Sequence, residues 1–221
     1  MTLLGFDTST PASSACVLRP DGESFEVAPD PARLAEGPAH ARELMPAVAD
    51  VMERAGIGFG DLEAIAVGVG PGTFTGLRIG IATARALAGA AGIPLRPVSS
   101  LAALAEGIDA DLRLALIDAR RGELFAALYD GEGTVWEPFV AAPDVVAERA
   151  RSEGPGVQAA GDGSLRFRGV LEAAGIGVDA TESRSHVVRA LNVCRLARTV
   201  PGEPPEQVHP DYLRAPDAKT Q

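Results

Sequence analysis

One order of residues occurs twice in the sequence, and it restricts the fold more than any other feature. The N-terminal segment LLGFDTSTPASSACVLRPDGESFEV contains an apolar run that ends at Asp7, a polar loop, a second apolar run and the turn Asp21-Gly22. The later segment LRLALIDARRGELFAALYDGEGTV repeats this order with Asp118 and Asp130-Gly131. Short apolar runs that are separated by Asp-Gly turns predict strand–turn–strand units. Two such units indicate a structural duplication, and with two copies of little identity chance is the alternative.

Helical periodicity follows the first unit. In HARELMPAVADVMERAG the apolar residues recur at helical spacing, and Gly56 supplies a stop. Residues 75–91, TGLRIGIATARALAGAA, predict a helix that is apolar nearly all round, in which only Arg78 and Arg85 are charged. Further helical patterns cover residues 143–153, 165–174 and 185–199, the last with Ser185 as its N-cap.

Strands followed by helices in both halves predict a two-lobed α/β protein. We expect the first lobe at residues 1–103 and the second at residues 104–221, where the second ends in a Pro-rich, extended tail. The junction between the lobes is predicted near residues 99–106.

Composition restricts the class of protein. The chain has 221 residues, a formal net charge of −10 and two cysteines, Cys16 and Cys194. The acidic balance argues against autonomous nucleic-acid binding, because such binding needs a basic face. Two cysteines are too few for a disulfide framework or a zinc cage. The start MTLLGFDTS does not have the pattern of a signal peptide, and Arg85 and Pro94 interrupt the most apolar window, so we expect a cytoplasmic protein with no membrane association.

The segment GVGPGTFTGLRIG joins a predicted strand to the helix predicted at residues 75–91. A Gly-rich turn before a helix N-terminus presents free backbone N–H groups to an anion. However, the lysine of a P-loop is absent, and Gly70, Gly72 and Gly76 have the spacing G-x-G-x-x-x-G, which is not the dinucleotide fingerprint. The spacing favours a tight turn with close helix–sheet packing, and a phosphate cradle is the alternative.

The longer segment GVGPGTFTGLRIGIATARALA closely resembles the signature of the TsaB (YeaZ) family, a subunit of the bacterial machinery that makes threonylcarbamoyladenosine in tRNA. The segments LLGFDTST, HARELMPAVADVMERAG, IPLRPVSSLAAL, IDARRGELFAALYD and PDYLR follow the family's order, so the resemblance covers nearly the whole chain. It implies the duplicated two-lobed actin-like fold of Hsp70 and sugar kinases. In that fold the first-strand loops of the two lobes face each other across a cleft.

The resemblance also implies a function. It implies a non-catalytic scaffold or dimerisation subunit that is required for threonylcarbamoylation of adenosine 37 in tRNA. Such a subunit would activate a TsaD-like catalytic paralogue and help to recruit a TsaE-like P-loop ATPase. It would form a homodimer when alone and meet tRNA only through the complex.

The catalytic paralogue TsaD binds a metal through an H-x-x-x-H pair. The matching positions here are Ser100 and Leu104, and Leu104 has no donor atom. The three histidines, His40, His186 and His209, are scattered along the chain. We therefore expect no metal site and no catalytic residue in this chain.

A degenerate nucleotide cleft is a further expectation. The loop DTST after the first strand has no glycine, whereas actin-like ATPases use glycine there to close the backbone on phosphates. No cofactor is firmly expected, and ATP or ADP with magnesium at a subunit interface is left open. The rival hypothesis is an ATP-using kinase or hydrolase with its own Mg-nucleotide site, and a third is a homodimeric structural protein. The expected cleft residues are Asp7, Thr8, Ser9, Gly70, Gly72 and Asp118.

The two predicted helices of the first lobe are the expected interface. A helix that is apolar all round needs a partner besides its sheet, and small residues admit another helix closely. The alternative is that both faces are covered within the monomer. TsaB subunits pair with TsaD through these two helices, so the resemblance favours an interface, where Arg78 and Arg85 would meet a partner carboxylate or solvent. The expected interface residues are Leu44, Met45, Val48, Met52, Gly76, Arg78, Gly80, Thr83 and Leu87.

Overall fold

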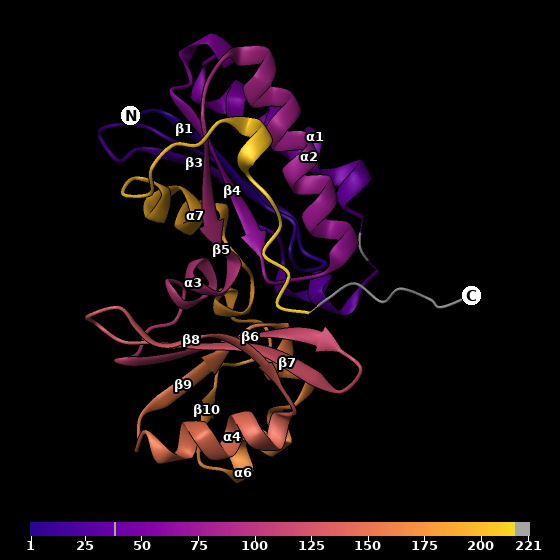
Figure 1. Ribbon diagram of the computed structural model, residues 1–221, viewed down its shortest axis with the longest axis vertical. Coiled ribbons are helices and arrows are strands. Elements are labelled where there is room, and N and C mark those ends of the chain that lie inside the picture. The colour runs from indigo at the N-terminus through magenta and orange to yellow at the C-terminus, as the bar shows by residue number, and fades with distance from the viewer. Residues whose placement is uncertain (38, 215–221) are drawn as a thin grey trace.

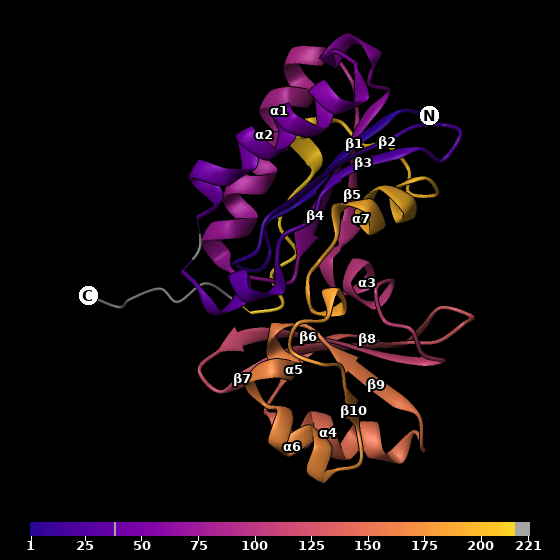
Figure 2. The ribbon, with the colours of Figure 1, turned by 180° about the vertical axis from the view of Figure 1, so that it is seen from behind.

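Two five-stranded mixed sheets form the framework of the protein, as a computed structural model of residues 1–37 and 39–214 shows (Figures 1 and 2). The strand order is β3-β2-β1-β4-β5 in the first sheet and β8-β7-β6-β9-β10 in the second. In each sheet the first three strands along the chain pair antiparallel, and the last two join in parallel. The predicted duplication and the two-lobed α/β architecture are therefore confirmed.

The strands of both sheets are short. Those of the first sheet are β1 (Leu3–Asp7), β2 (Ser14–Leu18), β3 (Ser24–Val27), β4 (Ala64–Gly70) and β5 (Leu95–Ser99). Those of the second are β6 (Leu112–Arg120), β7 (Glu123–Tyr129), β8 (Thr134–Ala141), β9 (Val157–Ala160) and β10 (Gly177–Val178).

Helices cover the outer faces of the two sheets and fill the space between them. The α-helices are α1 (His40–Ala55), α2 (Phe74–Ala91), α3 (Ser100–Ala105), α4 (Pro143–Ser152), α5 (Asp162–Arg166), α6 (Arg168–Ala173) and α7 (Ala190–Ala197). Short 3₁₀ helices lie at Pro31–Ala35, Phe59–Asp61, Arg184–His186 and Pro205–Gln207. Within the described residues no helix is long and apolar enough to cross a membrane.

The two-residue repeat of a strand divides the core into layers. On β1, Leu4 and Phe6 pack with the apolar residues of α1 and α2, whereas Leu3 packs on the opposite face with α7. Figure 1 shows α1 and α2 side by side on the outer face of the first sheet, with α3 and α7 between the sheets. The far face of the second sheet packs against α4 and α6.

The C-terminal part of the chain belongs with the first lobe, which corrects the division at residues 103 and 104. Helix α7 packs against β1 and β2. Beyond it, Glu203 pairs with Leu95 of β5, and the Asp211 N–H donates to the Val69 carbonyl over 2.8 Å. The chain therefore returns to the first sheet, and residues 215–221 of the expected tail lie outside the described residues.

Two helix predictions need correction. The pattern at residues 165–174 is two short helices, α5 and α6, which meet at Phe167. Ser185 is not an N-cap, because it lies inside the 3₁₀ helix at Arg184–His186, and its hydroxyl donates to Asp179. Helix α7 begins only at Ala190. The stop at Gly56 is confirmed, since this residue ends α1 in the left-handed conformation at φ 64°.

Candidate functional site

The glycine segment packs directly against the loop that follows β1. A Cβ atom on Gly72 would lie 2.5 Å from the Cβ of Ser9, and one on Gly76 would overlap the Thr8 carbonyl. A Cβ on Gly80 would overlap the Thr8 hydroxyl, which donates to the Gly76 carbonyl over 2.8 Å. These glycines therefore let α2 approach the first-strand loop closely, as the favoured interpretation of their spacing predicts.

Asp7, at the end of β1, is enclosed by the protein. Its carboxylate accepts hydrogen bonds from the Ser9 N–H at 2.7 Å, the Ser9 hydroxyl at 2.6 Å and the Ser100 hydroxyl at 2.7 Å. Burial raises the pKa of Asp7, and the hydrogen bonds from Ser9 and Ser100 oppose that shift. A hydrated magnesium ion needs a carboxylate that it can reach, and Asp7 is fully buried with its lone pairs engaged.

The two positions that match the metal-binding pair of TsaD have structural roles. Ser100 donates to Asp7, and Leu104 is fully buried in the core between the lobes. Among the described residues no group of three or more His, Cys, Asp and Glu side chains could hold a metal ion. His40 accepts or donates a 2.7 Å hydrogen bond at Nδ1 with Ser13, and His186 lies near the start of α5.

Asp118, at the equivalent place in the second lobe, is held by arginines. Its carboxylate is 2.7 Å from Arg166 and 3.1 Å from Arg120, and the side chain is 5% exposed. The Asp118 N–H donates to the Asp162 carboxylate over 2.9 Å. Burial and the charge of Asp118 raise the pKa of Asp162 to about 6. Hydrogen bonds hold the carboxylate of Asp7, and ion pairs with arginines hold that of Asp118, so neither carboxylate is free to bind a metal ion.

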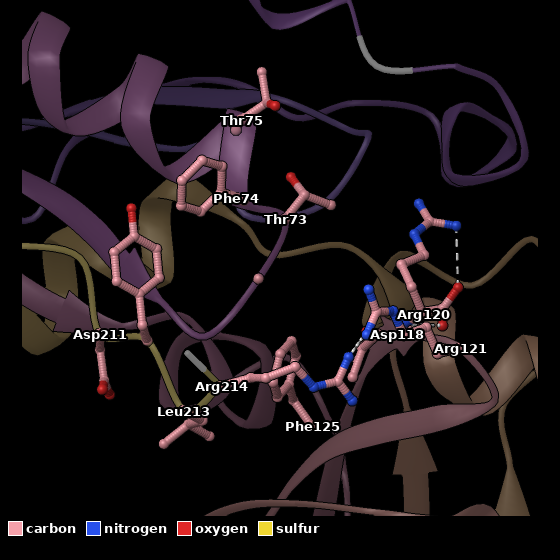
Figure 3. Close-up of a pocket in the computed structure, with 14 residues that line it drawn as sticks. Thr73, Phe74, Thr75, Asp118, Arg120, Arg121, Phe125, Asp211, Leu213 and Arg214 are labelled. Atoms are coloured by element: carbon pink, nitrogen blue, oxygen red, sulfur yellow. Dashed lines mark hydrogen bonds and ion pairs between the residues drawn. The ribbon is translucent and has the colours of Figure 1, made fainter. Parts of the chain in front are cut away.

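A cavity of about 520 Å³ lies between the two lobes. Figure 3 shows Thr73, Phe74 and Thr75 at the start of α2 on one side, and Asp118, Arg120 and Phe125 on the other. The C-terminal segment supplies a third wall. Of the expected cleft residues, Gly72 and Asp118 line this cavity. Asp7, Thr8 and Ser9 are buried behind the glycine segment, and Gly70 is buried at the end of β4.

The expected interface residues divide into buried and exposed groups. Leu44, Val48 and Met52 are at most 6% exposed and pack in the core beneath α1. Gly76 and Gly80 are buried against Thr8, so these five residues present little side-chain surface on the outside of the lobe, and their place in an interface stays a prediction. The residues with accessible surface are Met45, which is 45% exposed, Arg78, Thr83 and Leu87.

The C-terminal segment occupies part of the α2 surface. Arg85 Nε donates to the Val208 carbonyl over 3.1 Å, and Arg78 Nε donates to the Tyr212 hydroxyl over 3.2 Å. Tyr212 also stacks on Phe74, with ring centroids 5.4 Å apart. Arg78 and Arg85 were expected to meet a partner or solvent, and both contact the chain's own C-terminal segment, although Arg78 stays exposed. The motif PDYLR in this segment is part of the family resemblance, but the sequence did not predict its contacts with α2.

Comparisons of the sequence and the structure with known proteins identify the family of the chain. A family model described as "TsaD: tRNA N6-adenosine threonylcarbamoyltransferase" matches residues 34–190. An uncharacterized protein of Mycobacterium tuberculosis strain H37Rv is 36% identical over 99% of this chain and 94% of its own length. The "tRNA threonylcarbamoyladenosine biosynthesis protein TsaB" of Escherichia coli is 37% identical over 67% of this chain and 66% of its own length.

A solved structure extends the likeness to nearly the full length. "YeaZ from Pseudomonas aeruginosa" superposes with a TM-score of 0.79 at 31% identity, over 96% of this chain and 99% of the other. Both sheets of the present structure therefore have counterparts in that protein.

Proposed function

The chain belongs to the TsaB/YeaZ family and has its duplicated actin-like fold, and on that premise we propose that it acts in tRNA threonylcarbamoyladenosine biosynthesis as a non-catalytic subunit. Its role is to hold a TsaD-like catalytic paralogue in an active form. The reaction transfers a threonylcarbamoyl group from its adenylate to adenosine 37 of tRNA, and the paralogue supplies the chemistry.

The enclosure of Asp7 carries this proposal. In an actin-like enzyme the first-strand carboxylate must face the nucleotide and its magnesium ion. Here Asp7 is fully buried and accepts three hydrogen bonds from Ser9 and Ser100. Asp118 is neutralised by Arg166 and Arg120. These contacts support a scaffold over the rival kinase or hydrolase, which needs both carboxylates for magnesium.

The outer surface of α1 and α2 is the proposed docking site for the paralogue. The two helices lie side by side on the outside of the first lobe (Figure 2). Met45 is 45% exposed on α1, and Thr83 and Leu87 of α2 are partly exposed. An exposed methionine adapts to more than one partner surface, so the same face suits both a homodimer and the heterodimer. The heterodimer of this chain and the TsaD-like paralogue would then recruit a TsaE-like ATPase.

The test is reconstitution of the modification from purified components. We expect the TsaD-like paralogue, the ATPase and a threonylcarbamoyl-adenylate source to modify tRNA only when this chain is added. Nucleoside mass spectrometry of the digested tRNA provides the readout. Asp7→Asn in this chain should leave the yield unchanged where the protein is folded, because Asp7 does no chemistry. Full modification without the chain, or a yield abolished by a folded Asp7→Asn protein, would contradict the proposal.

A further inference from the structure

A second cavity, of about 530 Å³, lies between α2 and the C-terminal segment, and we call it the α2 groove. Its walls include Arg78 and Arg85 of α2, and His209 and Tyr212 of the C-terminal segment, which runs along α2 in Figure 1. We propose that acidic side chains of the TsaD-like partner insert into the α2 groove, where Arg78 is the residue that binds a carboxylate. This inference rests on the proposed docking function and adds the chemistry of the partner's surface.

Arg78 is exposed, yet its neighbours fix the orientation of its guanidinium group. The guanidinium carbon lies 3.8 Å from the centroid of the Phe74 ring, and Nε donates to the Tyr212 hydroxyl over 3.2 Å. The Tyr212 ring in turn stacks on Phe74, with centroids 5.4 Å apart. An arginine that is already fixed loses less side-chain entropy when it binds a ligand. Its Nη1 and Nη2 atoms make no hydrogen bond with the described residues, so both are available to an acceptor.

Arg85 supplies a second positive charge, seven residues further along the helix. Carbonyl groups of the C-terminal segment accept hydrogen bonds from it, but they do not neutralise its charge. Neither Arg78 nor Arg85 forms a salt bridge with a described carboxylate, in contrast to Arg120 and Arg214 at the cavity between the lobes. Among the described residues that line the α2 groove there is no Asp or Glu. The groove therefore presents two uncompensated cations.

The surroundings favour a protein carboxylate over a nucleic acid. The chain has a net charge of −10, and two arginines are few for a phosphate backbone. A carboxylate matches the planar fork of a guanidinium with two parallel hydrogen bonds. Phe74, which is 40% exposed, and Tyr212 lie beside Arg78, and aromatic residues and arginine are enriched in protein–protein interfaces.

The spacing of the two arginines describes the partner further. At about 1.5 Å per residue, Arg78 and Arg85 are about 10 Å apart along the axis of α2. A partner helix that carries two acidic residues two turns apart would meet both cations. Ala82 lies exposed between the arginines and lines the groove, so its small side chain leaves room for such a helix.

The test is the affinity for the TsaD-like paralogue of the same organism, measured by isothermal titration calorimetry at about 50 mM and about 500 mM NaCl. We expect Arg78→Glu to weaken binding at least about thirtyfold at the lower salt concentration. Arg78→Lys, which keeps the charge and loses the planar fork, should weaken it about three- to tenfold. Arg195→Glu makes the same change of charge at an exposed arginine of α7 and should stay within about twofold of wild type. The higher salt concentration should weaken wild type more than Arg78→Glu.

Other results overturn the proposal. If Arg78→Glu has unchanged thermal unfolding and binds the paralogue within about threefold of wild type, the groove does not bind a carboxylate of the partner. The docking role would still stand in that case if Met45→Glu weakens the complex. If Arg78→Glu weakens only the self-association of this chain, a second copy is the occupant, and if it abolishes binding of tRNA by this chain alone, a nucleic acid is. No complex with wild type would overturn both this inference and the docking role.

Discussion

Replacement of Asp162 by asparagine should change how the stability of the protein depends on pH. Asp162 begins α5, is partly buried, and accepts a hydrogen bond from the Asp118 N–H at 2.9 Å. Burial and the nearby charge of Asp118 raise its pKa from 3.8 to about 6. An asparagine oxygen can accept the same hydrogen bond, and it carries no charge at any pH.

The magnitude and sign follow from this pKa. Because the folded protein binds the proton more tightly than the unfolded chain, the carboxyl group stabilises the fold fully only below pH 3.8. That contribution is lost as the pH rises through about 6. At about 1.4 kcal/mol for each pKa unit, the loss is at most about 3 kcal/mol. The free energy of unfolding of Asp162→Asn should therefore rise relative to wild type between pH 4 and pH 7, and then stay level.

Urea unfolding at a series of pH values measures this difference. Asp109→Asn provides the matched control, since Asp109 is an exposed carboxylate, and its difference from wild type should be flat. If the difference between Asp162→Asn and wild type is also flat from pH 4 to pH 7, the burial argument for Asp162 is refuted.

Two other predictions follow from the packing of α2. Gly80→Ala should lower the free energy of unfolding by about 1–2 kcal/mol, because its methyl group would overlap the Thr8 hydroxyl. Gly89→Ala should raise it by up to about 1 kcal/mol, because a methyl group there meets nothing within 4 Å. Equal effects of the two substitutions in urea unfolding would contradict this. Arg85→Ala removes the hydrogen bond from Arg85 to the Val208 carbonyl and should speed hydrogen exchange of the Asp211 amide at least about tenfold. Unchanged exchange would show that Arg85 does not hold the C-terminal segment against α2.

Local patterns were sufficient to predict the duplicated architecture. The two Asp-Gly turns mark the connection between the second and third strands of each antiparallel unit. The unbroken apolar run that ends at Asp7 indicates a buried strand, and β1 is buried at all five positions. The stop at Gly56 follows from its left-handed conformation, which glycine adopts without a steric penalty. These features depend on residues that are close in the sequence, so the sequence alone predicts them.

The candidate site was harder to predict because its contacts are between distant segments. The apolar face of α1 indicates that Leu44 and Val48 are covered, but it does not say whether a sheet or a partner covers them. The C-terminal segment has no regular pattern, yet it takes Arg78 and Arg85 of α2 through Tyr212 and Val208. Pairings of this kind depend on the tertiary fold alone.

The most direct test of the docking role is complex formation with the TsaD-like paralogue of the same organism. A substitution at Gly80 of α2 cannot provide this test, because a side chain there would collide with Thr8 inside the lobe. Met45→Glu places a charge on the exposed face of α1, and Val145→Glu, at a 53% exposed valine of α4 in the other lobe, is the matched control.

Sedimentation velocity of the mixed proteins gives the answer. We expect wild type and Val145→Glu to form a stoichiometric heterodimer, and Met45→Glu to weaken it at least about tenfold while its thermal unfolding is unchanged. A folded Met45→Glu protein that binds the paralogue as tightly as wild type would place the interface elsewhere. No heterodimer with wild type would contradict the scaffold function itself.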